Sequence, residues 1–582
     1  MANGSSVARD HWSNAVQPRL AFLDDILDSQ RSQQRVSNGA QNAVDDELAA
    51  LDAGASHIRF RRNSLAPVCR IPPEILAVIF ELYILLFQLD ITHVHRDPGS
   101  PRTLANSNIA WVVSLTHVCR HWRNVALGSP TLWNRVDVST GLEWWTEMVS
   151  RSGTVPTTLD ASDYASCDSY RFRSGPPRDK SGCVLKRLHK ARVFPTHIHR
   201  TMDLHISGCV ANVKATVATL ATTPAPALQA LTLRPSPRPG SGGFFPKPKG
   251  KYTMISETLF SGVAPSLRRI SFENCYLPWT SPLLKNLTYL KMNSTNHDRG
   301  AHTGSFVDLL DALQTMSGLE TLILLQILPR DHRDCTPADR PVCNLPALEK
   351  IHVADIAGAC VALLSHINIP SCVDFDVDCT WCDGDGEYCC LVLPFLSAAI
   401  RRVQSSGKII RSLSIQRIHE GLLATLYEKD YELDSHHHKT KPTVRIVFDE
   451  SAMPDNHAES EDIIEKAIGL LAVDTLTTLD FDGWDWVEEQ WHLFDRATEV
   501  FHIHTNNATG ETIVPLLGRP YDSDASSHQR IFPHLRTLSL ESVNLTQIVP
   551  EGEEDLGTIL ARNLDDRVDV MEKLVLRECE LS

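Results

Sequence analysis

The sequence lacks the two features that direct a chain into or across a membrane. Its first twenty residues have no apolar stretch behind a basic start, so we expect no secretory signal. The most apolar stretch, residues 71–91, is interrupted by Glu74, Glu81, Gln88 and Asp90, which a membrane-spanning helix of about 20 residues tolerates poorly. We therefore expect a protein that stays inside the cell, in the cytoplasm, the nucleus or both, and has no membrane contact.

Positive charge is also in short supply. Lys and Arg together number 56 against 71 Asp and Glu, a formal net charge of −15. A chain that repels phosphate overall is a poor nucleic-acid binder, so we expect no nucleic-acid partner. With 582 residues, 42% of them apolar, the chain exceeds a single core of roughly 250 to 300 residues, which predicts several domains or a repeat array.

The familiar catalytic motifs are absent. The sequence contains no GxxxxGK[ST], no strand-linked GxGxxG, no HExxH and no GxSxG, which removes the usual signatures of phosphate binding, metalloprotease and serine hydrolase chemistry. We therefore expect a protein that is not an enzyme and needs no cofactor. The fifteen cysteines, without an export signal, are expected to be reduced thiols.

One cysteine cluster leaves an alternative open. Cys379 and Cys382 are two residues apart, and Cys389 and Cys390 follow shortly after them. Two thiolates at that spacing can chelate zinc, although a structural site normally adds a second well-spaced pair or histidines. The alternative function is therefore a zinc- or thiol-dependent enzyme that uses this cluster, and the preferred interpretation is a set of reduced cysteines around a strand.

The first 60 residues are polar and carry only short helical patterns. Apolar residues recur at three- and four-residue spacings within residues 20–27 and again within residues 44–51. Residues 1–18 have no such pattern, and we expect no regular structure there. The sequence predicts two short amphipathic helices ahead of the first domain.

Residues 61–140 are densely apolar and begin with a clear helix start. In Ile71-Pro72-Pro73-Glu74 the prolines suit the first turn of a helix, and the glutamate suits the positive end of its dipole. Helical spacing then predicts one broad apolar stripe. Its members are Ile75, Leu76, Ile79, Phe80 and Tyr83.

A second helix is predicted after a polar loop. Residues 92–106 are rich in turn-forming residues and predict a surface loop. The helix that follows ends at Gly128, with Pro130 just beyond it. Its apolar face is formed by Leu115, Val118, Cys119, Trp122 and Ala126.

Taken together, these residues closely resemble an F-box. Resemblance is sharp over about residues 60–160, because Glu143-Trp144-Trp145 and residues 150–153 are similar to the stretch that follows the F-box in many fungal members. An insertion of about 25 residues between the two helices departs from the family pattern. The motif stands here as Leu65-x-Pro67, Ile71-Pro72-x-Glu74-Ile75-Leu76-x-x-Ile79-Phe80, Leu115-x-x-Val118-Cys119-x-x-Trp122-Arg123-x-x-Ala126 and Leu132-Trp133.

The resemblance implies a function. In that family the motif is a small helical module that docks on the Skp adaptor of a cullin-RING ubiquitin ligase, while the rest of the chain holds a substrate. It implies a non-catalytic substrate-recognition subunit whose partners are the Skp adaptor, the cullin complex and an unidentified protein target. The implied adaptor-binding residues are Leu65, Pro67, Ile71, Pro72, Ile75, Leu76, Ile79, Phe80, Leu115, Val118, Cys119, Trp122 and Trp133.

Two further interpretations stay open beside this one. The same chain could bind the adaptor as a scaffold that never drives degradation. The apolar side chains of the motif could also pack into the protein's own core, as most amphipathic helices do.

Beyond residue 200 the pattern Leu-x-x-Leu-x-Leu returns with a mean step of about 31 residues, close to that of leucine-rich repeats. The x-Leu-x-Leu part predicts a short strand with alternate side chains inward, and the leucine three residues earlier fills the turn. Clear copies begin at Leu228, Leu267, Leu287, Leu319, Leu348, Leu476 and Leu535, and weaker copies at Thr201, Cys372, Ile410, Thr443, Thr498 and Met571.

The sequence therefore predicts an α/β fold: a small helical F-box-like module followed by an irregular leucine-rich-repeat solenoid. Short parallel strands would line one face, and helices such as those expected at 306–316 and 458–471 would form the outer layer. A Pro-, Gly- and Lys/Arg-rich loop is expected at 234–251. The predicted domains are 1–60 (polar N-terminus), 61–140 (F-box-like), 141–200 (connection) and 201–582 (repeats).

Overall fold

The structure of the chain is a computed structural model in which contacts define two compact units. Unit 1 comprises Met1–Arg135 and Trp144–Val155, and unit 2 comprises Val136–Glu143 and Pro156–Ser582. The residues that the structure describes are 3–32, 38–94, 110–137, 142–162, 193–236, 253–294, 304–334, 342–370, 374–381, 387–405, 407, 409–418, 421–427, 443–449, 465–466, 468–469, 473–482, 488–518, 531–548 and 554–581.

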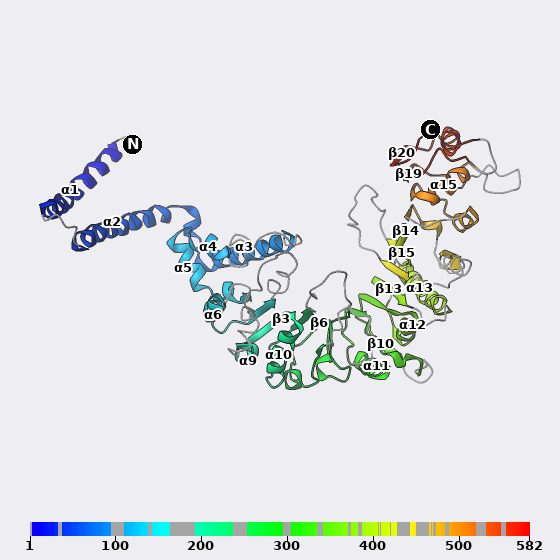
Figure 1. The fold of residues 1–582 in the computed structure, drawn as a ribbon, viewed down its shortest axis with the longest axis horizontal. Coiled ribbons are helices and arrows are strands. Elements are labelled where there is room, and N and C mark those ends of the chain that lie inside the picture. The colour runs from blue at the N-terminus through cyan, green and yellow to red at the C-terminus, as the bar shows by residue number, and fades with distance from the viewer. Residues whose placement is uncertain are drawn as a thin grey trace. The chain divides into compact units, whose positions relative to one another are not determined.

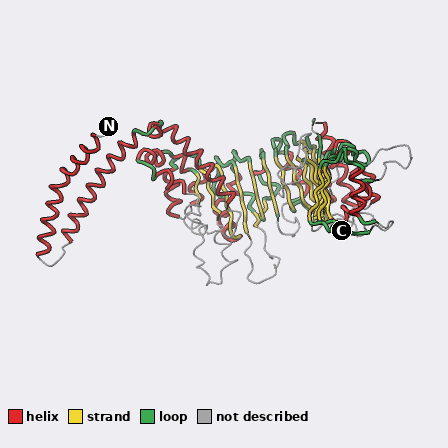
Figure 2. Tube along the Cα trace, turned by 90° about the horizontal axis from the view of Figure 1, so that it is seen from above, coloured by secondary structure: helices red, strands yellow, loops and turns green. Residues whose placement is uncertain are grey.

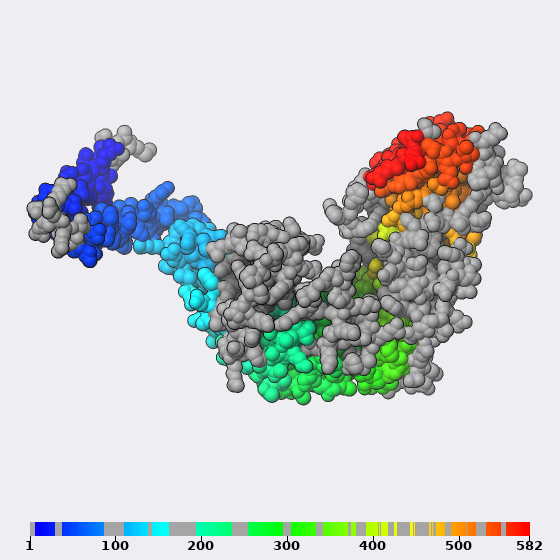
Figure 3. Space-filling model, viewed as in Figure 1, coloured from blue at the N-terminus to red at the C-terminus, as the bar shows by residue number. Residues whose placement is uncertain are grey.

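Unit 1 begins with two long helices, α1 (Asn3–Ser32) and α2 (Asn38–Ser64), which lie side by side (Figure 2). The Arg19 guanidinium forms an ion pair with the Glu47 carboxylate between them. Figure 3 draws this pair in dark blue, and α2 also contacts the rest of unit 1, since the Arg120 side chain donates a hydrogen bond to the Ser56 hydroxyl. The expectation that residues 1–18 lack regular structure is wrong for residues 3–18, because contact with α2 supports a helix whose own apolar spacing is weak.

The rest of unit 1 is a small cluster of helices. Its elements are η1 (Pro67–Arg70), α3 (Pro73–Val94), α4 (Ala110–Thr116), α5 (Arg120–Gly128), η3 (Pro130–Trp133) and α6 (Leu142–Arg151). The predicted helix start holds, since α3 begins at Pro73 with Glu74 in its first turn. The predicted end also holds, because α5 stops at Gly128 and Pro130 opens η3.

The second predicted helix is two helices. Cys119 has extended backbone angles (φ −158°, ψ 171°) and separates α4 from α5, with its sulfur accepting a hydrogen bond from the Trp122 amide. The Arg123 side chain donates to the Thr116 carbonyl at the end of α4, where the last carbonyls of a helix lack an intrahelical donor. Apolar spacing alone could not show this break, since both helices bury residues toward the same core.

Unit 2 is built on one large, mostly parallel sheet. Its order is β1-β2-β3-β4-β6-β8-β9-β11-β13-β16-β15-β14-β17-β18-β19-β20, and small pairs β5–β7 and β10–β12 lie beside it. The N-terminal strands of the large sheet are β1 (Arg135–Asp137), β2 (Thr157–Ser162), β3 (Thr201–Cys209), β4 (Ala230–Ser236), β6 (Arg269–Glu273), β8 (Tyr289–Asn293), β9 (Thr321–Leu325) and β11 (Lys350–Ile356). The remaining strands of the large sheet are β13 (Asp374–Trp381), β14 (Ser412–Ile418), β15 (Gly421–Tyr427), β16 (Val444–Asp449), β17 (Thr478–Asp482), β18 (His502–Asn506), β19 (Thr537–Glu541) and β20 (Lys573–Arg577). The two small pairs are formed by β5 (Thr253–Met254) with β7 (Cys275–Tyr276) and by β10 (Cys343–Asn344) with β12 (Ile367–Asn368).

Every predicted copy of the repeat pattern coincides with a strand of this sheet. In β6, for example, Ile270 and Phe272 are fully buried while their neighbours reach the surface. Leu267, three residues before Ile270, is buried in the preceding turn. Equivalent residues stack across strands, since Ile270 pairs in register with Leu231 and Leu290. The alternation of apolar and polar residues with a period of two therefore predicted the position of each of these strands correctly.

The order of three strands departs from the simple stack that the repeats predict. β16 pairs parallel with β13, β14 pairs parallel with β17, and β15 lies between β14 and β16, antiparallel to both. β15 runs back along β14, with Ile418 paired with Gly421, and β16 then takes the place beside β13. β15 carries no copy of the repeat pattern, which explains why the pattern alone predicts a consecutive order.

Helices cover one side of the strands. α10, α11 and α12 lie together on one side of the neighbouring strands (Figure 1). α11 coincides with the helix predicted at 306–316 and is closed by a capping box between Ser305 and Asp308, whereas residues 458–471 fall largely outside the described residues. The helices are α9 (Val193–His197), α10 (Val210–Leu220), α11 (Phe306–Gln314), α12 (Ala357–Ser365), α13 (Glu387–Ser405), α15 (Asn507–Leu516) and α16 (Leu556–Asp565).

One predicted feature, the loop at 234–251, is only partly within the described residues. The prediction is wrong for residues 234–236, which form the end of β4 because they pair with β3, and residues 237–251 lie outside the described residues. Among the described residues, no helix combines the length and the apolar character needed to cross a bilayer.

Candidate functional site

α3 carries two different apolar faces. Leu76, Phe80 and Ile84 lie four residues apart and are buried against the other helices of unit 1. The Phe80 ring contacts the Trp122 ring with centroids 5.0 Å apart. This face forms one half of the small core of the module.

The second face is open. Ile75 is 54% exposed and Ile79 is 43% exposed, although both are large aliphatic side chains. An apolar face on a small module normally marks a place where a partner is bound, because exposure of contiguous apolar side chains is unfavourable. The open face of α3, as we call it, comprises Ile75, Val78, Ile79, Leu82, Tyr83 and Leu86, which recur at helical spacing.

The other half of the module core is aromatic. Trp111 and Trp133 meet edge to face with centroids 5.1 Å apart, and both are buried. The Trp133 indole donates to the Ala126 carbonyl at 2.8 Å, and the Arg151 guanidinium lies over the same ring. These contacts connect η3 and α6 to α5.

Two cysteines lie close together beside this core. The Cys69 sulfur, in η1, is 3.8 Å from the Cys119 sulfur at the start of α5. Burial raises the pKa of the Cys69 thiol, and the hydrogen bond and the charge of Cys119 add to the rise. The Cys69 thiol is therefore protonated at neutral pH, and the two cysteines act as packing groups between η1 and α5.

The structure separates the residues implied by the F-box resemblance into three groups, so the expectation of a single stripe is wrong. Residues one position apart on a helix differ by about 100° in direction, which sends Ile75 and Ile79 outward and Leu76 and Phe80 inward. Exposed residues are Leu65, Pro67, Pro72, Ile75, Ile79 and Val118; partly covered ones are Ile71, Cys119 and Trp122; buried ones are Leu76, Phe80, Leu115 and Trp133.

Sequence reasoning missed part of the open face. Val78, Leu82 and Leu86 are 51%, 56% and 62% exposed, yet none was among the residues implied by the motif. The signal was present, because these positions follow Ile75 by three, seven and eleven residues. A motif match marks the residues shared by a family, whereas helical spacing marks the whole surface.

Unit 2 holds a polar cluster on the sheet face away from the helices. The Asp480 carboxylate accepts a hydrogen bond from the Ser414 hydroxyl and contacts His504 Nδ1, each at 2.7 Å. Glu541 lies 3.5 Å from His504 Nε2. Burial lowers the pKa of His504, but hydrogen bonds and charge from Asp480 and then Glu541 outweigh it and raise the pKa above its usual value.

This cluster contains the residue types of a hydrolase triad, Ser, His and Asp, but the contacts among them differ from those of a triad. Ser414 contacts the carboxylate of Asp480, whereas nucleophilic catalysis needs the serine to contact the histidine. The carboxylate therefore ties β14, β17 and β18 together, and the cluster offers no activated nucleophile.

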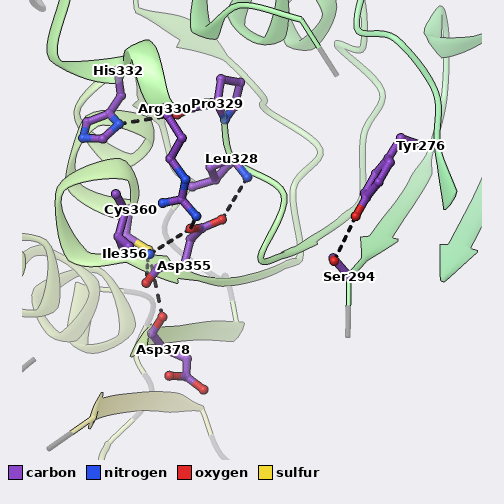
Figure 4. A network of polar contacts seen from close by, with 10 residues as sticks. All are labelled: Tyr276, Ser294, Leu328, Pro329, Arg330, His332, Asp355, Ile356, Cys360 and Asp378. Carbon is purple, nitrogen blue, oxygen red and sulfur yellow. Dashed lines mark hydrogen bonds and ion pairs between the residues drawn. The ribbon is translucent and has the colours of Figure 1, made fainter. Parts of the chain in front are cut away.

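A second polar network lies between β9 and α12 (Figure 4). The Asp355 carboxylate accepts hydrogen bonds from the Leu328 and Ile356 amides, each at 2.9 Å, and pairs with Arg330 at 3.0 Å. Burial raises the pKa of Asp355, although Arg330 and the two amides oppose the rise. Both carboxylate oxygens are engaged, so this group holds the loop after β9 against the start of α12 rather than offering a base to a substrate.

The cysteine cluster is described only in part. Cys379 is fully buried in β13, while the side chains of Cys382, Cys389 and Cys390 lie outside those that the structure describes. Among the described side chains no group of three or more His, Cys, Asp or Glu residues could hold a metal ion. The metal alternative therefore stays a prediction, to be decided by measurement.

Comparison with known proteins adds no assignment. Neither the models of known protein families nor the curated proteins give a match to this chain.

Proposed function

We propose that the chain is an F-box-type substrate receptor. Its helical module docks on the Skp adaptor of a cullin-RING ubiquitin ligase through the open face of α3, and unit 2 holds the protein target. The sheet of unit 2 serves in this proposal as an irregular leucine-rich-repeat solenoid. No bond is made by the chain itself, which raises the effective concentration of a target lysine near a ubiquitin-loaded enzyme.

The observation that carries the proposal is the exposure of Ile75 and Ile79 on a helix whose opposite face is fully packed. A helix that is apolar on both sides is normally buried on both sides. Here the other helices of the module cover only the first face, so the second face remains available to another polypeptide. The motif resemblance names the adaptor as that polypeptide.

Capture of the adaptor tests this proposal. Covering an aliphatic side chain that is about half exposed contributes roughly 1 kcal/mol, so the double variant Ile75→Ala, Ile79→Ala is expected to lose roughly 2 kcal/mol, or about 30-fold in affinity. The measurement is binding of purified full-length chain to the Skp adaptor from the same cell. We expect capture by the wild-type chain and its loss in the double variant.

A matched control uses two exposed valines of unit 2. Val263 and Val342 are 47% and 50% exposed, and the variant Val263→Ala, Val342→Ala truncates two half-exposed aliphatic side chains of unit 2. It should retain the adaptor fully. Undiminished capture by a folded α3 variant, or no capture by the wild-type chain, would contradict the proposal.

The scaffold interpretation calls for a separate measurement. Ubiquitinated partners are compared between cells that express the wild-type chain and cells that express the Ile75→Ala, Ile79→Ala variant. Loss of ubiquitin from a captured partner in the variant supports a substrate receptor, whereas an unchanged pattern despite lost adaptor binding favours a scaffold.

A further inference from the structure

The exposed face of the sheet presents an ordered grid of side chains across β6, β8, β9 and β11. Parallel pairing places Arg269 beside Tyr289, and Lys291 beside Ile323. The next strand continues both rows, with Lys350 beside Thr321 and His352 beside Ile323. Because side chains alternate along a strand, these residues all lie on the face opposite the buried leucines.

Positive charge gathers in this grid, in contrast to the acidic chain as a whole. We call Arg234, Arg269, Lys291 and Lys350 the basic patch. Lys291 and Arg234 share one carboxylate, that of Glu273, at 3.3 and 3.5 Å. Within the described part of the chain, no carboxylate lies at ion-pair distance from Arg269 or Lys350. Four cations thus face one anion on strands β4 to β11.

The electrostatic environment of His352 is consistent with this excess of positive charge. Burial lowers the pKa of His352 first of all. Asp376 opposes the effect, and the nearby cations Arg445, Lys350 and Lys291 lower the pKa further. His352 is therefore neutral near pH 7 and does not add a charge of its own.

The patch has a sharp boundary on one side. On β13 the exposed-face positions are Asp374, Asp376 and Asp378, in register with Lys350, His352 and Ala354 of β11. Asp376 is paired with Arg445 at 2.9 Å, and Asp374 and Asp378 stand on either side of it along the edge of the patch. An anionic ligand is attracted by the cations of β6 to β11 and disfavoured at the three aspartates of β13.

Apolar surface lies among the cations. Ile323 and Leu325 of β9 are partly exposed, and the Tyr289 ring lies under the Arg269 guanidinium at 4.9 Å. Neighbouring strands lie about 4.8 Å apart, so β6 to β11 spans about 14 Å, the length of four or five residues of extended peptide. The surface therefore suits a short segment that combines carboxylates with apolar side chains.

We propose that the basic patch docks an acidic segment of the protein target, which rests on the proposed function of unit 2 as the substrate-holding part. Carboxylates of the segment pair with Arg269, Lys291 and Lys350, while its apolar side chains cover Ile323 and Leu325. A nucleic acid fits this surface poorly, because four cations bordered by aspartates do not match a continuous phosphate backbone.

Binding of simple probes to the full-length chain tests the proposal. The probe is a fluorescein-labelled hexaglutamate peptide, followed by fluorescence anisotropy at low salt, beside hexaglutamine and an oligothymidine of equal length. Hexaglutamate should bind most tightly, and its affinity should fall as salt is added. The double variant Lys291→Met, Lys350→Met should bind it about five- to tenfold more weakly.

Two further variants make the test specific. Lys573→Met removes an exposed lysine of β20 on the same sheet face, far along the strand order, and should leave hexaglutamate binding unchanged. Asp374→Asn removes negative charge at the boundary and should strengthen binding about twofold. Equal binding of hexaglutamine, tighter binding of oligothymidine, or an equal loss in Lys573→Met would overturn the proposal. In the proposed function adaptor capture uses unit 1, whereas hexaglutamate binding uses unit 2, so the two can fail independently.

Discussion

Truncation of a side chain to alanine should lower the stability of unit 1 by different amounts on the two faces of α3. Leu76→Ala and Ile79→Ala each remove three carbons from one helix, but Leu76 is 1% exposed and Ile79 is 43% exposed. A buried leucine truncated to alanine costs about 2 to 5 kcal/mol, because it leaves a cavity as well as losing burial. Truncation of the half-covered isoleucine should cost about 1 kcal/mol or less.

These costs convert into measurable shifts. For a unit of about 150 residues such as unit 1, 1 kcal/mol corresponds to about 2 to 4 °C in Tm, so a loss of about 2 to 5 kcal/mol in Leu76→Ala should lower the transition of unit 1 by about 4 to 20 °C. Calorimetry on the full-length chain gives the transition, and hydrogen exchange of peptides from α3 to α5 assigns it to unit 1. Ile79→Ala should leave exchange in these peptides nearly unchanged.

Leu82→Ala is the matched control, since it makes the same chemical change as Leu76→Ala on the same helix at a side chain that is 56% exposed. It should behave like Ile79→Ala. Equal destabilisation by Leu76→Ala and Leu82→Ala would refute the division of α3 into a packed face and an open face.

Two other predictions concern unit 2. Because Asp480 and Glu541 raise the folded-state pKa of His504, its contribution to stability is fully present below its ordinary pKa of 6.5 and is lost as pH rises through the raised value. Urea midpoints of the wild-type chain should therefore fall between pH 6 and pH 9 by more than those of His504→Gln, and equal falls would contradict this. For the cysteine cluster around Cys379, elemental analysis of purified protein should find no stoichiometric zinc, whereas one zinc per chain would revive the metal alternative.

The strands were predictable from the sequence because each one needs only local information. A strand that buries one face shows alternation within five residues, and the leucine before it fills the turn below. Ile270, Leu290 and Leu322 fall on this pattern and are fully buried in neighbouring strands. Even the weaker copies, such as the one that begins at Thr498, correspond to strands.

The order of the strands was not predictable in the same way. β15 sits between β14 and β16 although it lacks the repeat pattern, and β16 crosses back to β13. Which strand pairs with which depends on how the chain turns between them, a choice that single-strand patterns do not encode. The break at Cys119 and the helix over residues 3–18 likewise depend on contacts with distant residues.

By itself the sequence determined the α/β class, the positions of the repeat strands and the start of α3, because hydrophobic period, proline placement and turn residues act over a few residues. Only the tertiary structure decided that Leu76 and Phe80 face inward while Ile75 and Ile79 face outward, and that Arg269, Lys291 and Lys350 lie on neighbouring strands. Burial and charge density are properties of the space around a residue, and residues far apart in the chain fill that space.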